Sequence, residues 1–160
     1  MSFEDAIAAQ VERCYQHAEN QLKRPFPRPS ISFAMRGQAA GAAHLQHNRL
    51  RFNPVLAAQN QQAFIDQVVP HEVCHLLAWQ LYGKVKPHGR EWQALMVNLF
   101  AVRPDTRHQF DVSAVAPRTF SYRCNCRLHQ LTIRRHNKIL RGQAEYRCRL
   151  CQSPLQSALS

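Results

Sequence analysis

The sequence predicts an α+β protein made of a larger N-terminal domain and a small C-terminal β module. Apolar residues recur at helical spacing within residues 3–22, 60–82 and 90–100, whereas residues 31–53 begin with alternating Ile31, Phe33 and Met35 and continue in short runs broken by glycines. After residue 117 the chain carries four of its six cysteines, in two close pairs. With 160 residues, the chain has room for one medium domain and one small module.

The first helix is expected over residues 3–22, where apolar side chains form a stripe between polar ones. Ser2 and Asp5 have the spacing of a capping box at its start. A proline-rich run then ends the helix, because proline lacks an amide donor. Residues 31–53 predict two or three antiparallel strands, and Asn53-Pro54 marks the next turn.

A second helix is expected over residues 60–82 and should end at Gly83, a residue type that often caps helices. Pro70 lies inside this stretch, so the helix should either bend there or begin afresh near it. A third helix is expected from Arg90 to Phe100, where apolar residues again recur at helical spacing.

Residues 105–117 have the composition of a connecting segment, so we predict one domain over residues 1–116 and a second over residues 117–160. The chain has a net charge of +11. Between residues 118 and 151, nine basic residues against one acidic residue account for +8 of that charge. Such a surface attracts polyanions, and nucleic acid is the first candidate.

No export signal or membrane span is expected. The first residues lack a basic and apolar signal pattern, and no window approaches the roughly eighteen uninterrupted apolar residues that a span needs. The cysteines are therefore expected in a reducing compartment, where close pairs indicate metal ligands before disulfides. We predict a cytoplasmic protein, compatible with nucleoid association, without a membrane partner.

The sequence His71-Glu72-Val73-Cys74-His75 is an H-E-x-x-H motif within the second expected helix. Imidazoles four residues apart lie on one helical face, so His71 and His75 can bind one zinc ion. Glu72 lies beside that ion and is the candidate general base that takes a proton from a zinc-bound water. Cys74 faces away from the two ligands and is expected in the core.

A hydrolytic zinc site usually takes three protein ligands, so a third must come from elsewhere. His88 and Glu91 both follow the end of the helix within ten residues. We favour His88, because imidazole is the commoner zinc ligand and a turn can fold it back over the metal. A group that stabilises the oxyanion is also expected, and Tyr82, Arg90 or a backbone amide could serve.

The two cysteine pairs predict a second, structural zinc site in a small zinc ribbon. Residues 128–133 and 138–140 between the pairs indicate short strands around a turn. The first pair is tighter than usual, so His129 could replace Cys124 as a ligand. The predicted ligands are Cys124, Cys126, Cys148 and Cys151.

The same module carries cations and aromatic rings suited to phosphates and bases. The candidate DNA-binding residues are Arg134, Arg135, Lys138 and Arg141, with Phe120, Tyr122 and Tyr146 nearby. Because no helix is expected there to read base edges, we expect weak sequence preference. A solvated hairpin or a protein-docking surface is the alternative.

Taken together, these motifs resemble bacterial SprT proteins. The resemblance rests on five linked segments: Val69–His75, Pro87–Trp92, Tyr122–Cys126, Arg134–Asn137 and Tyr146–Cys151. SprT proteins are similar to the metalloprotease domain of Spartan, which degrades proteins crosslinked to DNA. The resemblance implies a zincin-like metalloprotease domain with His71, His75 and His88 on the catalytic zinc and Glu72 as catalytic residue, followed by a SprT-type zinc ribbon.

The leading hypothesis is therefore a zinc metallopeptidase that acts on proteins bound or crosslinked to DNA. It would use one catalytic and one structural zinc, with the ribbon as DNA-binding module. Holding the protease at DNA would raise its local concentration near such substrates. A nucleic-acid-binding zinc protein without catalysis is the first alternative, and a zinc hydrolase of small amides is the second.

Overall fold

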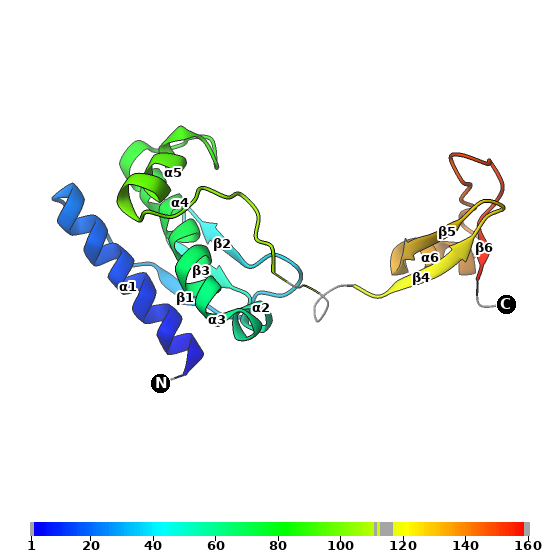
Figure 1. The fold of residues 1–160 in the computed structure, drawn as a ribbon, viewed down its shortest axis with the longest axis horizontal. Helices are drawn as coiled ribbons and strands as arrows, with labels where there is room; N and C mark the ends of the chain where they lie inside the picture. The colour runs from blue at the N-terminus through cyan, green and yellow to red at the C-terminus, as the bar shows by residue number, and fades with distance from the viewer. Residues whose placement is uncertain (1, 111, 113–116, 159–160) are drawn as a thin grey trace. The chain divides into compact units, whose positions relative to one another are not determined.

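The structure is a computed structural model that describes residues 2–110, 112 and 117–158, and its chain divides into two compact units, Met1–Val115 and Ala116–Ser160 (Figure 1). The predicted domain boundary lies next to residues 113–116, outside the described residues. The first unit contains α1 (Phe3–Leu22), β1 (Ser30–Ser32), β2 (Gly41–His44), β3 (Arg49–Phe52), α2 (Pro54–Gln59), α3 (Gln61–Ala63), η1 (Phe64–Val68), α4 (Val69–Tyr82), α5 (Arg90–Ala94) and η2 (Leu95–Leu99). The second unit contains β4 (Thr119–Arg123), β5 (Leu128–Thr132), α6 (Ile133–Leu140) and β6 (Gln156–Ser157).

Helix α1 has the predicted bounds and the predicted capping box, in which the Ser2 hydroxyl accepts from the amide of Asp5 and the Asp5 carboxylate accepts from the amide of Ser2. Its apolar stripe packs on α4, and Ile7 and Tyr15 are fully buried there. The helix ends at Lys23, which adopts a left-handed conformation. The sequence pattern was therefore sufficient for this helix.

The sheet of the first unit has three strands in the order β1-β3-β2. Strands β2 and β3 form the expected antiparallel hairpin. Strand β1 pairs with β3 in parallel, so the expectation of a wholly antiparallel sheet was wrong. The cause is that the chain crosses from β1 to the far side of β3 before forming β2, and hydropathy alternation carries no information about that crossing.

Asn53 begins a helix instead of the predicted simple turn. Its side-chain oxygen accepts from the amides of Val55 and Leu56 at the start of α2, and Pro54 occupies the first helical turn. Its side-chain amide donates to the backbone carbonyls of Gly37 and Ala39. The fully buried Asn53 therefore ties α2 to the loop that leads into β2.

The second predicted helix is present as α3, η1 and α4, which follow one another with helical backbone at Val68 and Val69. The η1 segment is a π-helix and lies directly before Pro70. Pro70 is in the first turn of α4, and because the backbone before it is already helical, its missing amide leaves the preceding π-helical turn without one hydrogen-bond donor. Gly83 ends α4 with a positive φ, and its amide donates to the carbonyl of Trp79.

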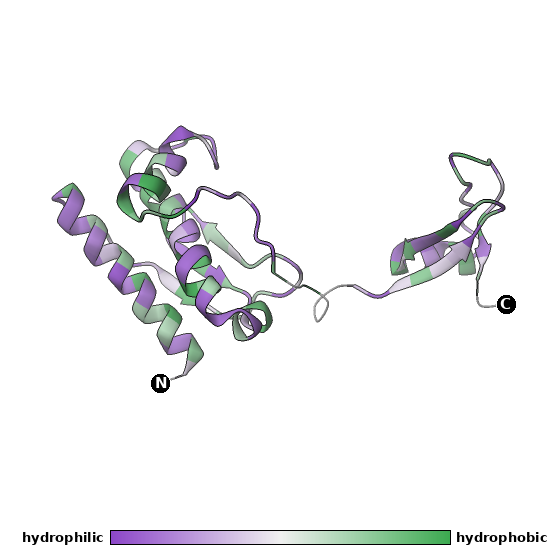
Figure 2. Ribbon diagram, viewed as in Figure 1, coloured by the Kyte–Doolittle hydropathy of each residue, from purple (hydrophilic) through white to green (hydrophobic). Residues whose placement is uncertain are grey.

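The core of the first unit lies between α1, the sheet and α4. Figure 2 shows hydrophobic residues interspersed with hydrophilic ones along both α1 and α4. The third predicted helix is present as α5 followed by the π-helix η2. Its Trp92 is among the largest fully buried side chains. Cys74 is also fully buried, as predicted for a core position. The helix that carries the H-E-x-x-H motif is thus the central element of this unit.

The second unit differs from the predicted ribbon in one element. Strands β4 and β5 pair antiparallel around the first cysteine pair, and β6 joins the other edge of β4. The stretch 133–140, predicted to turn and form a second strand, is the helix α6. Its start is fixed by Thr132, whose hydroxyl accepts from the amide of Arg135. Strand β5 pairs with β4, which precedes the first cysteine pair, and not with residues 138–140.

Candidate metal centres

Three ring nitrogens converge in the first unit. The Nε2 atom of His88 lies 3.2 Å from Nε2 of His75 and 3.3 Å from Nε2 of His71. A tetrahedral zinc with bonds of about 2.0–2.1 Å separates its nitrogen ligands by about 3.3–3.4 Å. The three histidines, which we call the histidine cluster, thus have the spacing and the chemistry of one face of a zinc site.

Two elements bring the histidine cluster together. His71 and His75 are one turn apart on α4, so their rings project from the same helical face. Gly83 then ends the helix, and a turn places His88 over that face before α5 begins at Arg90. The local sequence thus positions both the helical pair and the third ring.

Trp92 supports all three rings from α5. Its ring centroid lies 4.8 Å from that of His71, 5.4 Å from that of His75 and 4.7 Å from that of His88. Its indole N–H also donates to the backbone carbonyl of His71 at 3.1 Å. The ring of His71 further bonds to the backbone of Asp105. These contacts orient the imidazoles in the way that second-shell groups orient metal ligands.

The electrostatics of the histidine cluster favour neutral rings. Burial, followed by the charge of His88, lowers the pKa of His71 to about 4. Burial and the two neighbouring rings lower the pKa of His75 to about 3, and burial lowers the pKa of His88. Neutral imidazole is the form that binds metal, so all three rings are ready to act as ligands near neutral pH.

Glu72 is one of two buried polar side chains among the described residues, with 6% of its surface exposed. Its carboxylate oxygen lies 3.7 Å from Nε2 of His71. Burial raises the pKa of Glu72 to about 8. A cation on the neighbouring imidazoles would act in the opposite direction, because opposite charge favours the carboxylate.

Gly41 of β2 lies against Glu72. A Cβ atom at position 41 would come within 3.0 Å of the Glu72 Cγ and 3.2 Å of the Arg51 carbonyl oxygen. The absence of a side chain at Gly41 therefore lets the strand approach the carboxylate-bearing face of α4.

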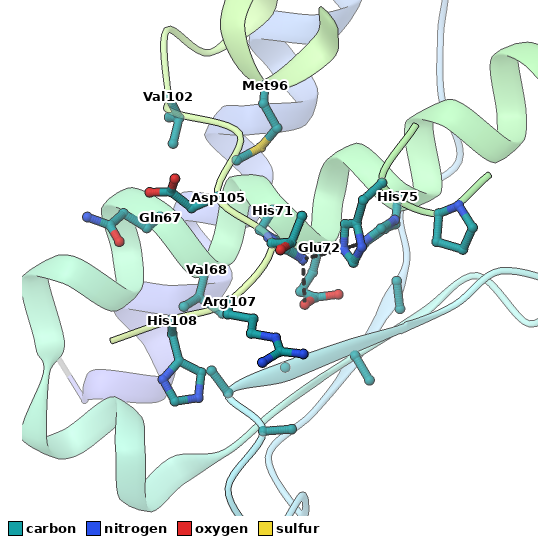
Figure 3. Close-up of a pocket in the computed structure, with 18 of the residues that line it drawn as sticks. Gln67, Val68, His71, Glu72, His75, Met96, Val102, Asp105, Arg107 and His108 are labelled. Carbon is teal, nitrogen blue, oxygen red and sulfur yellow. Dashed lines mark hydrogen bonds and ion pairs between the residues drawn. The ribbon is translucent and has the colours of Figure 1, made fainter. Parts of the chain in front are cut away.

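The histidine cluster and Glu72 line a cleft of about 1080 Å³ (Figure 3). One wall is β2 with the loop before it, and another is the segment from Ala101 to Phe110, which we call the strap. Between these walls the imidazoles and the carboxylate face open space. This arrangement is that of a metal site with room for a ligand, not of a closed structural site.

Several residues considered from the sequence lie elsewhere. Glu91 pairs with Arg90 at 3.8 Å and does not join the histidine cluster. The side chain of Arg90 is 95% exposed and that of Tyr82 projects largely into solvent, and neither lines the cleft. The geometry therefore favours neither as an oxyanion-stabilising group.

Four sulfur atoms converge in the second unit. The Sγ atom of Cys126 lies 3.5 Å from that of Cys124 and 3.7 Å from that of Cys148, close to the sulfur spacing of about 3.8 Å around a tetrahedral zinc. All four sulfurs, including that of Cys151, lie within 4.8 Å of one another. We call this set the cysteine cluster. His129 lies beside it, with Nε2 3.2 Å from the sulfur of Cys124.

Hydrogen bonds shift the pKa values of the thiols in the cysteine cluster in different directions. The Ser153 hydroxyl, together with its amide, lowers the pKa of Cys151 to about 5. Backbone amides of Cys151 and Leu150 lower the pKa of Cys148. A hydrogen bond with Cys124 raises the pKa of Cys126 to about 12. Amide and hydroxyl donors around sulfur are the surroundings in which thiolates bind metal.

The candidate DNA-binding residues lie on α6 or at its end. Arg134, Arg135 and Lys138 belong to the helix, and Arg141 caps it. The Arg135 guanidinium lies 5.6 Å from the centre of the Tyr146 ring. Because these cations lie on a helix, the reason given for weak sequence preference, the absence of a helix, was wrong.

Comparisons with known proteins match both units. Residues 11–114 match the SprT-like family, and residues 118–159 match the SprT-like zinc ribbon domain. Protein SprT of Shewanella oneidensis is 53% identical over 152 residues, which cover 95% of this chain and 97% of the relative. The chain belongs to the SprT family. Protein SprT of Vibrio parahaemolyticus is 50% identical over 142 residues, covering 89% of this chain and 86% of the relative. No solved structure matches the chain.

Membership of the SprT family confirms the resemblance drawn from the linked motifs. The mixed fold of helices and a small sheet, followed by a zinc ribbon domain, is likewise confirmed. None of the described helices is both long enough and apolar enough to cross a membrane.

Sequence reasoning missed two parts of this SprT-family site. The part of the strap from residue 105 onward was expected to be a connecting segment, and no role in the site was expected for Gly41. Phe110 gave a weak signal for the strap, because an aromatic residue in a connecting segment often packs on a core. It stacks on Phe64, with ring centroids 6.2 Å apart.

Proposed function

We propose that this protein is a zinc metallopeptidase with a zincin-like catalytic domain, which cleaves proteins bound or crosslinked to DNA. The observation that carries the proposal is the convergence of the histidine cluster beside the buried carboxylate of Glu72, in a cleft open to a ligand. The H-E-x-x-H motif supplies the residue types, and the structure supplies a third imidazole and a cleft.

His71, His75 and His88 would hold the catalytic zinc. When bound, zinc supplies a Lewis acid that polarises a carbonyl group and makes a neighbouring water more acidic. The three imidazoles leave one side of the cluster toward the cleft, where substrate can enter. Trp92 and the backbone of Asp105 keep the rings in position.

Glu72 would move the proton during peptide hydrolysis. The water oxygen bonds to the carbonyl carbon while its proton passes to the Glu72 carboxylate. The C–N bond then breaks, and Glu72 returns that proton to the amine nitrogen that leaves. The Glu72 carboxylate lies beside the histidine cluster and lines the cleft, where it can take a proton from a water at that site.

Strand β2 would hold the substrate chain. It lies at one edge of its three-stranded sheet and lines the cleft from Gly41 to Ala43. The exposed main-chain groups of an edge strand can pair with an extended peptide. A polypeptide bound in this way would run past Glu72, because Gly41 contacts that side chain.

The second unit would be the DNA-binding module. The cysteine cluster would hold a structural zinc, and α6 presents Arg134, Arg135 and Lys138 with Arg141 at its end. Arg135 beside Tyr146 combines a cation with a ring that can stack on a base. Attachment to DNA would bring the protease to its protein substrates.

The test is cleavage of a DNA-binding protein by the purified chain, with and without single- or double-stranded DNA. We expect two zinc ions per wild-type chain and cleavage that DNA stimulates. Glu72→Gln keeps the shape of the side chain and removes its ability to accept a proton. This variant should retain both zinc ions and lose cleavage by roughly 10²-fold or more, the lower limit of a general-base contribution.

The outcomes separate the functional classes. Cleavage that persists at the wild-type rate in Glu72→Gln contradicts the mechanism. Zinc and DNA binding without cleavage by the wild type, with every DNA form, would favour a non-catalytic nucleic-acid-binding zinc protein. DNA affinity that does not fall between low and high salt would contradict phosphate contacts by the ribbon.

A further inference from the structure

We propose that Arg107 is a catalytic residue of this site, whose guanidinium stabilises the negative charge that develops on the carbonyl oxygen of the cleaved peptide bond. The inference rests on the proposed peptidase function and assigns a residue to the oxyanion-stabilising role. That role needs a positioned hydrogen-bond donor that faces the reacting carbonyl. The donor must not already be bonded to another group of the protein.

The strap that carries Arg107 is fixed on both sides of it. Two residues before, the backbone of Asp105 bonds to the ring of His71. One residue after, Nε2 of His108 lies 2.8 Å from the carbonyl oxygen of Gln38, in the loop that leads to β2. The strap therefore connects the histidine cluster to the substrate-binding wall, and Arg107 lies between the two attachments.

The side chain of Arg107 extends into the cleft on the side of Glu72 (Figure 3). No hydrogen bond or ion pair with a described residue holds its guanidinium. Within the described part of the chain, Glu72 pairs with His71 and not with Arg107, and both Glu72 and Arg107 line the cleft. A carbonyl between the carboxylate and the guanidinium would have the base on one side and a hydrogen-bond donor on the other.

The other cationic side chains that line the cleft are already engaged. Arg103 lies 3.7 Å from Asp105 and is 88% exposed. Both ring nitrogens of His108 are used: Nε2–H donates to Gln38, and Nδ1 accepts from the amide of Phe110 at 3.2 Å. Of the described cleft-lining residues outside the histidine cluster, Arg107 is thus the cation without an ion-pair or hydrogen-bond partner among the described residues.

The chemistry fits a guanidinium. As the water oxygen adds to the carbonyl carbon, the carbonyl oxygen gains negative charge, and this charge disappears when the C–N bond breaks. Arg107 donates hydrogen bonds to that oxygen without exchanging a proton, because guanidinium stays protonated at any working pH. Its interaction is stronger in the transition state than in bound substrate and therefore raises kcat more than it lowers KM.

The experiment measures kcat and KM for a protein substrate with wild type, Arg107→Gln, Arg107→Lys and Arg90→Gln. We expect Arg107→Gln to lower kcat by roughly 10²-fold, the effect of losing one oxyanion donor, with little change in KM. Arg107→Lys keeps the charge and should recover part of that loss. Arg90→Gln removes the same charge from a solvent-exposed position and should leave kcat unchanged.

Zinc content and thermal unfolding show whether each variant is folded and loaded. A folded, two-zinc Arg107→Gln with wild-type kcat would overturn the role of Arg107 while the peptidase function stands. A higher KM at unchanged kcat would also overturn it, because Arg107 would then bind only the ground state. A wild type that cleaves nothing while binding two zinc ions would overturn the peptidase function and this inference together.

Discussion

The histidine cluster and the cysteine cluster are both candidate zinc sites, but they are embedded in different surroundings. The histidine cluster lies on the central helix of a unit whose core includes Tyr15, Phe52 and Trp92, all fully buried. The second unit has few buried hydrophobic side chains among its described residues, namely Tyr122, Leu131 and Cys148. One of these three is itself a candidate ligand.

This difference implies that the folding of the two units depends on metal to different degrees. In the first unit the elements that carry the imidazoles pack on the hydrophobic core, so we expect the site to keep its geometry without metal. In the second unit the apolar core is too small to order the chain, and binding of zinc to four sulfurs would supply the folding energy. One zinc would act on a substrate, whereas the other would hold a structure.

Cysteine substitution should produce the largest difference between the two units. Cys148→Ser replaces the buried sulfur of the cysteine cluster, and we expect the second unit to lose its fold and one zinc ion. His75→Asn removes one ligand of the other site, and we expect loss of the other zinc while the first unit stays folded. Zinc stoichiometry, circular dichroism and amide hydrogen exchange of the full chain measure these effects.

Cys14→Ser is the matched control for Cys148→Ser, because Cys14 is a buried cysteine outside both clusters. It should keep both zinc ions. If Cys148→Ser left the second unit protected from hydrogen exchange, the idea that metal orders this unit would be wrong. If His75→Asn unfolded the first unit, its site would depend on metal as the ribbon does.

Charge substitution on α6 should produce a smaller effect, confined to DNA binding. Changing Arg134 and Arg135 together to glutamine removes two candidate phosphate contacts. Each such contact contributes about 0.9 to the slope of log affinity against log salt concentration, so the slope should become shallower by roughly 2. Affinity at low salt should fall by about tenfold or more, and zinc content should not change.

The matched control is the pair Arg147→Gln and Arg149→Gln in the same unit, which removes the same total charge away from α6. Arg147 already pairs with Glu145 at 2.8 Å and is less available to phosphate. Fluorescence anisotropy with labelled single- and double-stranded DNA across salt concentrations measures both pairs. An equal loss in the two variants would assign binding to net charge and not to α6.

The sequence was sufficient where one local pattern determined the structure. The capping box and apolar stripe of α1 gave its bounds, and Gly83 gave the end of α4. The H-E-x-x-H spacing depends only on helix geometry, so the sequence placed His71 and His75 on one face. The sequence favoured His88 over Glu91 as the third ligand, because a turn after Gly83 can fold an imidazole back over that face.

The sequence pattern did not predict which strands pair with one another. Residues 128–133 and 138–140 were expected as two short strands around a turn, yet β5 pairs with β4 and residues 133–140 form α6. The parallel pairing of β1 with β3 has the same origin, since the route of the connecting chain is absent from hydropathy. The strap was missed because it has no regular secondary structure and is held by single contacts, such as the His108 ring with the Gln38 carbonyl and the Phe110 ring with Phe64.

A methyl group at Gly41 should produce the smallest of these effects and show how closely the core holds Glu72. In Gly41→Ala the new Cβ would meet the Glu72 Cγ at 3.0 Å, within a space that the Arg51 carbonyl also restricts. The carboxylate should shift by a few tenths of an ångström. A displacement of about 1 Å can cost about 10²-fold in rate, so we expect a roughly fivefold lower kcat with both zinc ions retained.

The comparison for Gly41→Ala is Gly142→Ala, because Gly142 lies in the second unit and a Cβ there would meet no atom within 4 Å. Its positive φ of 69° makes alanine strained, so this variant reports on ribbon stability and should leave kcat for a DNA-free peptide unchanged. Unchanged kcat in Gly41→Ala would mean that Glu72 tolerates displacement and that the first site is less rigid than its buried surroundings imply. A loss of zinc would instead show that β2 supports the imidazoles as well as the carboxylate.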